Sequence, residues 1–130
     1  MKPDTVKAGN VGAIVQMLEK EGFRICAMKM LHLSAPQAEG FYHVHKARPF
    51  FPGLVKFMTE GPIVAAVLES DDAIQKLRKL MGATDPAKAE AGTIRKLYAT
   101  NIERNGIHGS DGPETAAFEI SYFFNHLEIV

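Results

Sequence analysis

The feature that most constrains the fold of this chain is the unbroken apolar run from Ile63 to Leu68. Turn-forming residues bound it, with Gly61-Pro62 before it and an acidic stretch that ends in Asp71-Asp72 after it. A short apolar run between turn signals is typical of a strand that is buried on both faces. The sequence therefore predicts a sheet whose faces are covered by other elements.

The rest of the chain supplies elements to cover that strand. Phe23 to Leu33 is rich in apolar residues and predicts a second strand, although periodicity alone does not exclude a helix there. Helical spacing or helix-start signals mark five segments. Four of them are Val11–Leu18 before Gly22, Leu54–Met58, the segment from Asp71 to Gly82, and Glu114–Phe124. The fifth begins at Ser34, with Gln37 at the capping-box position, and would include Phe41, Tyr42 and His45. Residues 83–94 predict a long irregular loop, and such loops are often functional. Helices that alternate with a few strands indicate an α/β or α+β sandwich.

Composition limits the class of protein. The chain has 130 residues and is 46% hydrophobic, which predicts one domain over residues 1–130. Its net charge is zero, so no overall field favours nucleic acid or an anionic membrane. Cys26 is the one cysteine and fits a reducing compartment as a core residue. With no signal peptide and no apolar run long enough to span a bilayer, a soluble cytoplasmic domain is expected.

The loop from Asn105 to Asp111 is the strongest candidate for chemistry. Its His108 is mostly neutral near pH 7 and therefore nucleophilic, and Gly109 beside it lets another group approach the backbone. Pro113 then opens a helix, so the histidine is presented just before a helix start, where it could react with an anionic group. The alternative is a solvated turn, because Asn, Gly, Ser and Asp are also common turn residues.

Several further motifs accompany this loop in a fixed order, and together they resemble the nucleoside diphosphate kinases. The motifs are Lys2-Pro3-Asp4 with Val6, Phe41-Tyr42, Arg48-Pro49-Phe50-Phe51, Gly61-Pro62, Leu80-Met81-Gly82-Ala83-Thr84-Asp85-Pro86, Gly92-Thr93-Ile94-Arg95 and Asn105 through Asp111. The resemblance runs from Lys2 almost to the C-terminus. It implies a ferredoxin-like α/β (α+β) sandwich, an antiparallel sheet with helices packed on it.

The resemblance also implies a reaction. The terminal phosphoryl group of a nucleoside triphosphate would pass to a nucleoside diphosphate by a ping-pong mechanism through a phosphohistidine on His108. An alternative is an N-terminally truncated, catalytically impaired homologue that acts as a phosphohistidine carrier or interaction protein.

Site residues follow from the same resemblance. Beside His108, Glu119 would hold the imidazole ring, Ser110 would steady that carboxylate, and Tyr42 would donate from its hydroxyl. The implied nucleotide-binding residues are Lys2, Phe50, Arg78, Thr84, Arg95, Ile102 and Asn105. The arginines have forked donors that suit phosphate, and Phe50 facing Ile102 would grip a base without reading its edges.

Each of these residues has an ordinary structural interpretation when it is taken alone. Arg78 could be solvated on a helix face, Phe50 could belong to the core, and Tyr42 could serve packing only. His43 and His45 could suggest a metal pair, but side chains at this spacing point apart on a helix, so we interpret them as structural or surface residues.

The resemblance implies further partners. Mg²⁺ is expected as the cofactor, carried by the nucleotide phosphates, because no carboxylate cluster has the spacing of a metal cage. Nucleoside tri- and diphosphates are the expected ligands, with no nucleic acid and no membrane. A homo-oligomer, tetramer or hexamer, is also implied.

The start of the chain departs from the family pattern. Relatives carry a short segment before Lys-Pro-Asp that forms the first strand of the sheet, and that strand is apparently missing here, because Met1 directly precedes Lys2. Either the start was assigned too late, which we favour because every downstream site residue is intact, or the short form is genuine. For the sequence as given we expect Lys2 on a frayed terminus, together with poor solubility or weak activity.

Overall fold

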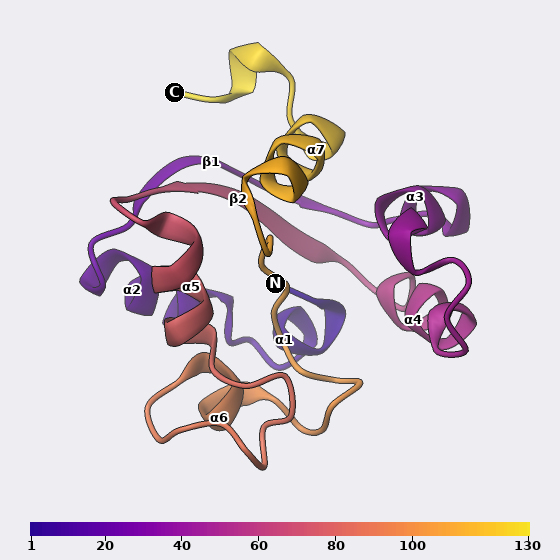
Figure 1. Cartoon of the computed structure of the whole chain (residues 1–130), viewed down its shortest axis with the longest axis horizontal. Helices are drawn as coiled ribbons and strands as arrows, with labels where there is room; N and C mark the ends of the chain where they lie inside the picture. Colours follow the sequence, from indigo (N-terminus) through magenta and orange to yellow (C-terminus); the bar gives the residue numbers. More distant parts are fainter.

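A computed structural model describes residues 1–130 and contains helices around a small sheet (Figure 1). In chain order the elements are α1 (Pro3–Lys7), α2 (Val11–Lys20), β1 (Arg24–Leu31), α3 (Ala35–Phe41), the 3₁₀ helix η1 (His43–His45), α4 (Phe51–Met58), β2 (Ile63–Glu69), α5 (Ala73–Met81), α6 (Ile94–Tyr98), α7 (Pro113–Phe123) and the 3₁₀ helix η2 (His126–Glu128).

The sheet has two antiparallel strands, β1 and β2. The apolar run that begins at Ile63 forms β2, as the sequence predicts, and Met30 of β1 lies opposite Val64. The register shifts between Ile25 and Ala27, where β1 bulges. The antiparallel α+β architecture expected from the sequence is confirmed.

Helices cover both faces of β2. Successive side chains of the strand point to opposite sides, so they pack against different helices. Val67 packs with Phe124, directly after α7. Leu68 points to the other face and packs against a cluster that contains Ile14 and Leu18 of α2. Ile14 is completely buried, so α2 is held to the sheet by its apolar stripe.

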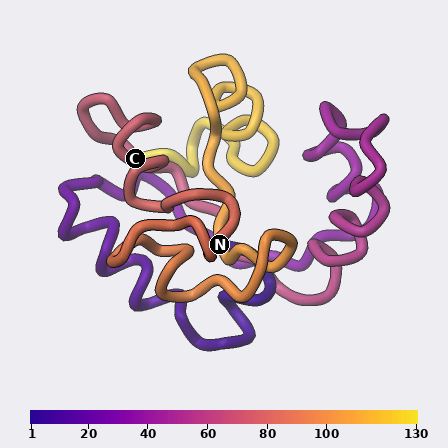
Figure 2. The backbone as a smooth tube through the Cα atoms, turned by 60° about the horizontal axis from the view of Figure 1, so that its bottom comes forward, coloured from indigo at the N-terminus to yellow at the C-terminus, as the bar shows by residue number.

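Helices α3 and α4 form an arm at one end of the sheet (Figure 2). The Ser34–Gln37 capping box that the sequence predicts is present, with hydrogen bonds of 2.8 and 3.4 Å. Phe41 and Phe57 belong to the cluster that joins the two helices, and Ile63 connects this cluster to β2. The arm therefore has its own apolar core next to the sheet.

The predicted helix that begins at Ser34 is shorter than expected. It ends at Phe41, and residues His43–His45 form a 3₁₀ turn instead. A ring nitrogen of His43 lies 3.2 Å from the carbonyl oxygen of Gly40 and competes with the next helical hydrogen bond. The tightening places Tyr42 at the end of α3, where its ring is buried.

The expectation that Lys2 lies on a frayed terminus is wrong. The backbone of Met1 and that of Val64 exchange two hydrogen bonds, of 2.7 and 3.0 Å. The amide of Lys2 donates to the carbonyl of Gly106 at 2.9 Å, and Lys2 is 8% exposed. These bonds fix the first residues between β2 and the loop that carries His108. None of the helices is long and apolar enough to cross a membrane.

Candidate active site

The loop that carries His108 is anchored from the N-terminal end of the chain. A carboxylate oxygen of Asp4 accepts a hydrogen bond from the amide of Gly106 at 3.0 Å, and the hydroxyl of Thr5 donates to the carbonyl of Gly106 at 2.8 Å. Gly106 has a φ of +79°, which a residue with a Cβ adopts only under strain. Both polar groups of its backbone are therefore held by α1.

Gly109 brings the loop against α5. A Cβ at this position would lie 2.9 Å from the sulfur of Met81 and 3.1 Å from a methyl carbon of Leu77. The sequence predicts that Gly109 permits a close approach, and the group that approaches is a side chain of α5. A Cβ here would require the ends of the Met81 and Leu77 side chains to move.

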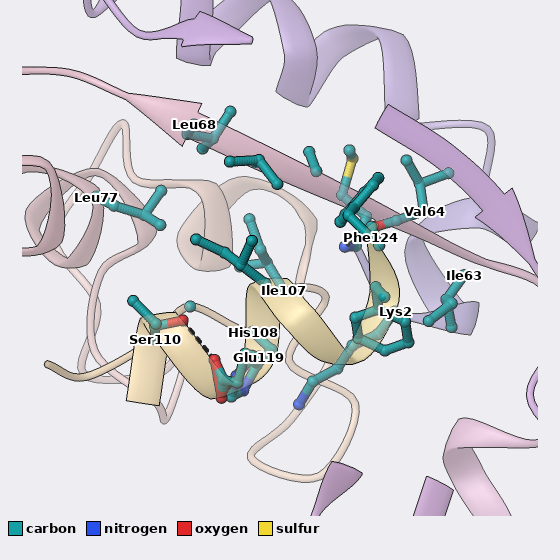
Figure 3. A pocket seen from close by; sticks show the side chains of 18 of the residues that line it. Lys2, Ile63, Val64, Leu68, Leu77, Ile107, His108, Ser110, Glu119 and Phe124 are labelled. Atoms are coloured by element: carbon teal, nitrogen blue, oxygen red, sulfur yellow. Dashed lines mark hydrogen bonds and ion pairs between the residues drawn. The ribbon is translucent and has the colours of Figure 1, made fainter. Parts of the chain in front are cut away.

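His108, Glu119 and Ser110 form a hydrogen-bonded chain (Figure 3). One carboxylate oxygen of Glu119, from α7, lies 2.7 Å from Nε2 of His108, and the other accepts from the Ser110 hydroxyl. A carboxylate only accepts, so Nε2 is the donor and carries the hydrogen. In a neutral imidazole the lone pair then lies on Nδ1, which is the nitrogen free to react.

The carboxylate of Glu119 is kept ionised. Burial alone would raise its pKa, but hydrogen bonding and proximity to His108, together with the Ser110 hydroxyl, bring the pKa below its usual value. An ionised carboxylate at Nε2 stabilises positive charge on the ring. The pair therefore suits an imidazole that gains charge during a reaction.

Two aromatic rings enclose the imidazole of His108. The ring centroid of Phe41 lies 5.3 Å away and that of Tyr42 lies 5.7 Å away, both edge to face. The hydroxyl of Tyr42 is buried with no hydrogen-bond partner. Burial, with a contribution from Glu119, raises the pKa of Tyr42, so the hydroxyl keeps its proton and is available to donate. A buried donor without a partner beside a histidine suits an acceptor oxygen from a ligand.

Lys2 and Asn105 form a buried pair. The ammonium of Lys2 donates to the side-chain oxygen of Asn105 at 2.7 Å. Burial lowers the pKa of Lys2 from 10.5 to about 8, and Arg95 acts in the same direction, while Asp4 opposes them. Lys2 therefore still carries its proton at neutral pH, but Asp4 compensates only part of the cost of burying the charge.

Arg95 links the segment after α5 to the loop that carries His108. It lies on α6, and its two terminal nitrogens donate to the carbonyls of Gly82 at 3.0 Å and Ile107 at 2.9 Å. Its Nε is buried without a partner. Burial, followed by repulsion from Arg78, lowers its pKa. Arg95, Arg78 and Thr84 line one polar cavity of about 470 Å³.

The remaining two predicted residues lie on the surface. Phe50 is 53% exposed at the start of α4, and Ile102 is 58% exposed in the loop that follows α6. A second, mostly apolar cavity has His108, Tyr42 and Glu119 in its lining, and neither Phe50 nor Ile102 lines it or the polar cavity. The loop of Ile102 is tied to α4 by Arg104, whose guanidinium makes two hydrogen bonds to Glu60, of 3.0 and 2.9 Å.

Sequence reasoning missed two contributors to this site. Phe41 contacts the His108 ring, and Asp4 holds the backbone beside it. Both residues stand inside motifs that the sequence analysis quoted, Phe41-Tyr42 and Lys2-Pro3-Asp4, so the signal was present. Spacing along the chain did not reveal that α1 and α3 meet the same loop.

The polar side chains around the polar cavity are mainly cations and hydroxyls, with one carboxylate, that of Glu90. The chain has no group of three or more His, Cys, Asp or Glu side chains placed to hold a metal ion. The cations and hydroxyls suit phosphate oxygens.

An oriented histidine next to a cationic, hydroxyl-bearing cavity in an α+β sandwich defines the class of phosphate-binding enzymes that react through histidine. Comparison with known proteins narrows the class. Residues 1–129 match the family described as nucleoside diphosphate kinase. The chain belongs to the nucleoside diphosphate kinase family.

Individual relatives agree along the whole chain. A nucleoside diphosphate kinase of Desulfosudis oleivorans is 58% identical over 130 residues, which cover 100% of this chain and 94% of that protein. One of Anaeromyxobacter sp. is 60% identical over 129 residues, covering 99% of this chain and 88% of that protein.

Solved structures give the same result for the fold. The Aquifex aeolicus nucleoside diphosphate kinase superposes with a TM-score of 0.97 at 45% identity, over 99% of this chain and 94% of that one. A Halobacterium salinarum nucleoside diphosphate kinase in complex with CDP gives a TM-score of 0.95 at 42% identity, over 99% of this chain and 86% of that one.

Proposed function

We propose that this protein transfers the terminal phosphoryl group of a nucleoside triphosphate to a nucleoside diphosphate, by a ping-pong mechanism in which Nδ1 of His108 carries the group. The observation that carries the proposal is the hydrogen bond of Glu119 to Nε2 of His108, because it leaves Nδ1 with the lone pair. Family membership supplies the substrates, since the relatives are nucleoside diphosphate kinases.

The first half-reaction forms one bond and breaks one. The lone pair of Nδ1 forms a bond to the terminal phosphorus, and the bond from that phosphorus to its bridging oxygen breaks. The nucleoside diphosphate leaves with the electron pair, and the proton on Nε2 stays with the ring, facing Glu119. In the second half-reaction a terminal oxygen of another diphosphate attacks the phosphorus, and the N–P bond breaks to restore the neutral imidazole.

Catalysis of this kind depends on charge compensation and positioning. Arg95 contributes to the lowered pKa of Lys2, and Arg78 contributes to the lowered pKa of Arg95, which indicates neighbouring cations whose charge is not fully compensated. A polyphosphate would supply the remaining countercharge. Tyr42 and Thr84 would donate to phosphate oxygens, and Ser110 would keep Glu119 in place.

Mg²⁺ would accompany the nucleotide and neutralise part of its phosphate charge. Lys2 and Asn105 would reach the sugar hydroxyls, and the base would lie between Phe50 and Ile102. Both apolar groups are exposed and free of polar selectivity, which favours tolerance of different bases. We further propose that residues 1–130 form one domain, that the protein is cytoplasmic, and that it works as a homo-oligomer, tetramer or hexamer.

The test is a labelled-phosphate chase. The protein is incubated with ATP labelled at its terminal phosphate, freed of nucleotide, and then mixed with a different nucleoside diphosphate. Acid-labile label should appear on the wild-type protein, be absent from His108→Ala, and pass to the acceptor. Label that forms but never leaves would instead identify the impaired phosphohistidine carrier, which the comparisons do not favour. No labelling of folded protein would overturn both functions.

A further inference from the structure

Helix α7 is joined to the arm of α3 and α4 by one polar contact. The hydroxyl of Tyr122, near the end of α7, donates to the backbone carbonyl of Gln37 in α3 at 2.7 Å. No other hydrogen bond connects α7 with α3 or α4. One turn earlier on α7, the ring of Phe118 lies edge to face with that of His43, at 4.9 Å between centroids. The Tyr122 hydroxyl is therefore the directional contact that sets the position of α3 on α7.

Gly40 leaves room for this contact. A Cβ at Gly40 would lie 2.5 Å from the hydroxyl oxygen of Tyr122. Glycine is disfavoured inside a helix because it loses more conformational freedom on folding than alanine does. The φ of Gly40 is not positive, so a left-handed conformation does not explain the glycine. The space that Tyr122 occupies does explain it.

The turn that Tyr122 holds is the one that ends in the aromatic neighbours of His108. Gln37 lies four residues before Phe41, so its carbonyl belongs to the last turn of α3. A carbonyl oxygen has two lone pairs and can accept from Tyr122 in addition to a helical amide. Phe41 and Tyr42 end this turn, and both rings contact the imidazole of His108. A shift of the Gln37 carbonyl would therefore move the hydroxyl of Tyr42.

The same helix also holds the reactive histidine. Glu119 lies three residues before Tyr122 on α7, and its carboxylate lies 2.7 Å from Nε2 of His108. Residues three apart in a helix are neighbours on its surface. One turn of α7 thus fixes the imidazole ring through Glu119 and the end of α3 through Tyr122. The spacing between His108 and Tyr42 is set by this single rigid turn.

We infer that Tyr122 is a positioning residue for phosphoryl transfer, whose hydroxyl holds the end of α3 on α7 so that Tyr42 stays in place to donate to the phosphoryl group at His108. Tyr122 acts through Tyr42 and does not contact the substrate. The inference rests on the proposed function, in which Tyr42 donates to a phosphate oxygen. Because the apolar packing of α3 remains when the hydroxyl is removed, the loss should be moderate.

The experiment measures the rate at which ATP phosphorylates His108 in a single turnover, as acid-labile label after rapid quenching. For Tyr122→Phe, which removes only the hydroxyl, we expect the limiting rate at saturating ATP to fall about fivefold, because a small displacement of a catalytic group slows the chemical step. The ATP concentration that gives half this rate should stay near the wild-type value. Ser121→Ala is the matched control, since its hydroxyl donates to the carbonyl of Phe118 within α7, and it should react like wild type.

The outcomes separate the inference from the proposed function. A folded wild-type protein that takes up no label would contradict the proposed function. Normal labelling of the wild type, together with an unchanged limiting rate in Tyr122→Phe, would overturn the inference alone. A change confined to the ATP concentration dependence would also overturn it, since Tyr122 would then affect binding and not the transfer step.

Two double variants test the route through Tyr42. In Tyr42→Phe the donor is already absent, so adding Tyr122→Phe should cause no further loss of rate. Gly40→Ala should slow the reaction by displacing the Tyr122 hydroxyl. In the Tyr122→Phe background the nearest ring atoms lie 3.3 and 3.5 Å from the added Cβ, so Gly40→Ala should have no further effect there. Losses by the same factor in both backgrounds would overturn the inference, because Tyr122 would then support the fold in general.

Discussion

The hydrogen bond between His108 and Glu119 decides which ring nitrogen reacts. Because Glu119 accepts from Nε2, the free lone pair lies on Nδ1, and the ring is held at a fixed angle between Phe41 and Tyr42. Replacing the carboxylate by an amide keeps the shape of the side chain and removes its charge. This substitution therefore separates orientation of the ring from electrostatic support of it.

For Glu119→Gln we expect kcat to fall by about 10- to 100-fold, the usual cost of losing a partner that orients a reactive imidazole. KM should change little, because Glu119 lies on the far side of the ring from the nitrogen that meets phosphate. Steady-state kinetics with varied nucleoside diphosphate measure both quantities. Glu114→Gln, on the exposed side of the same helix, is the control and should behave as wild type. A rise in KM without a fall in kcat would contradict the assignment.

Lys2 should give nucleotide binding an alkaline limit. Its pKa of about 8 means that the ammonium is lost as the pH rises above that value, and a neutral amine attracts phosphate poorly. We expect KM for nucleotide to rise above pH 8 in the wild type. The Lys2→Ala variant should have a higher KM at neutral pH and no further rise above pH 8. A rise above pH 8 that persists in this variant would belong to another group.

The same group affects folding in the opposite direction. The pKa of Lys2 is depressed from 10.5 to about 8 in the folded protein, so the unfolded chain holds this proton to higher pH. Folding therefore releases a proton between these two values. The contribution of Lys2 to the free energy of unfolding is lowest below about pH 8 and improves as the pH rises towards 10.5.

At the scale of elements, the proposed base-binding surface should depend on a tether between the C-terminal end of α4 and the loop of Ile102. Arg104 bonds twice to Glu60 and lies over the ring of Phe57, at 4.8 Å from its centroid. The ion pair is exposed, and exposed pairs contribute little to stability. Its effect should therefore appear in the position of the loop.

For Arg104→Ala we expect KM for nucleotide to rise by about three- to tenfold, because the loop of Ile102 must be ordered on binding. The melting temperature and kcat should stay near wild type. Arg24→Ala is a matched control, since it breaks another exposed ion pair, with Glu69 at 2.7 Å, at the end of β1. An equal rise in KM for both variants would remove the loop tether as the cause.

The sequence predicts best those helices and strands that are long enough to show a regular spacing of apolar residues. The strand at Ile63, the amphipathic helix at Val11 and the helix opened by Pro113 all appear where expected. Helices α1 and α6 have five residues each, which is too short for a helical period to be visible. They form because tertiary contacts hold them, as the buried Ile94 and Arg95 of α6 show.

The site was predictable to a different extent. The residue identities came from ordered motifs, and most of these residues line one of two cavities in the structure. The roles of Asp4 and Phe41 depend on contacts between distant segments, which spacing along the chain does not encode. The alternation of apolar residues likewise did not reveal that Met1 would pair with Val64.

At the scale of the molecule, the stability of the protein should depend on its ligand. Of 71 backbone hydrogen bonds, 34 lie in turns, loops and helix caps, so a large share of the bonding lies outside regular helices and strands. The polar cavity adds cations that repel one another, with Arg78 lowering the pKa of Arg95. An anion that binds there relieves this repulsion only in the folded state.

We expect a nucleoside diphosphate at about 100 times its Kd to add about 2.7 kcal/mol to the free energy of unfolding, which corresponds to a rise in melting temperature of roughly 10 °C. Differential scanning fluorimetry measures the shift. The matching nucleoside, which lacks phosphate, should produce only a small shift because it cannot reach Arg78 and Arg95. Equal shifts for both ligands would contradict the assignment of phosphate binding to the polar cavity.

Arg95 has a consequence for which substitutions the chain tolerates. Its guanidinium donates to the carbonyls of Gly82 and Ile107, so it joins the edge of the polar cavity to the residue before His108. A lysine would preserve the charge but has a single ammonium, which lacks the rigid fork needed to hold both carbonyls. We therefore expect the fold not to tolerate lysine at position 95, whereas at position 78, whose guanidinium holds no backbone carbonyl, it should tolerate either cation. A library that varies both positions should recover arginine and lysine at 78 and arginine alone at 95.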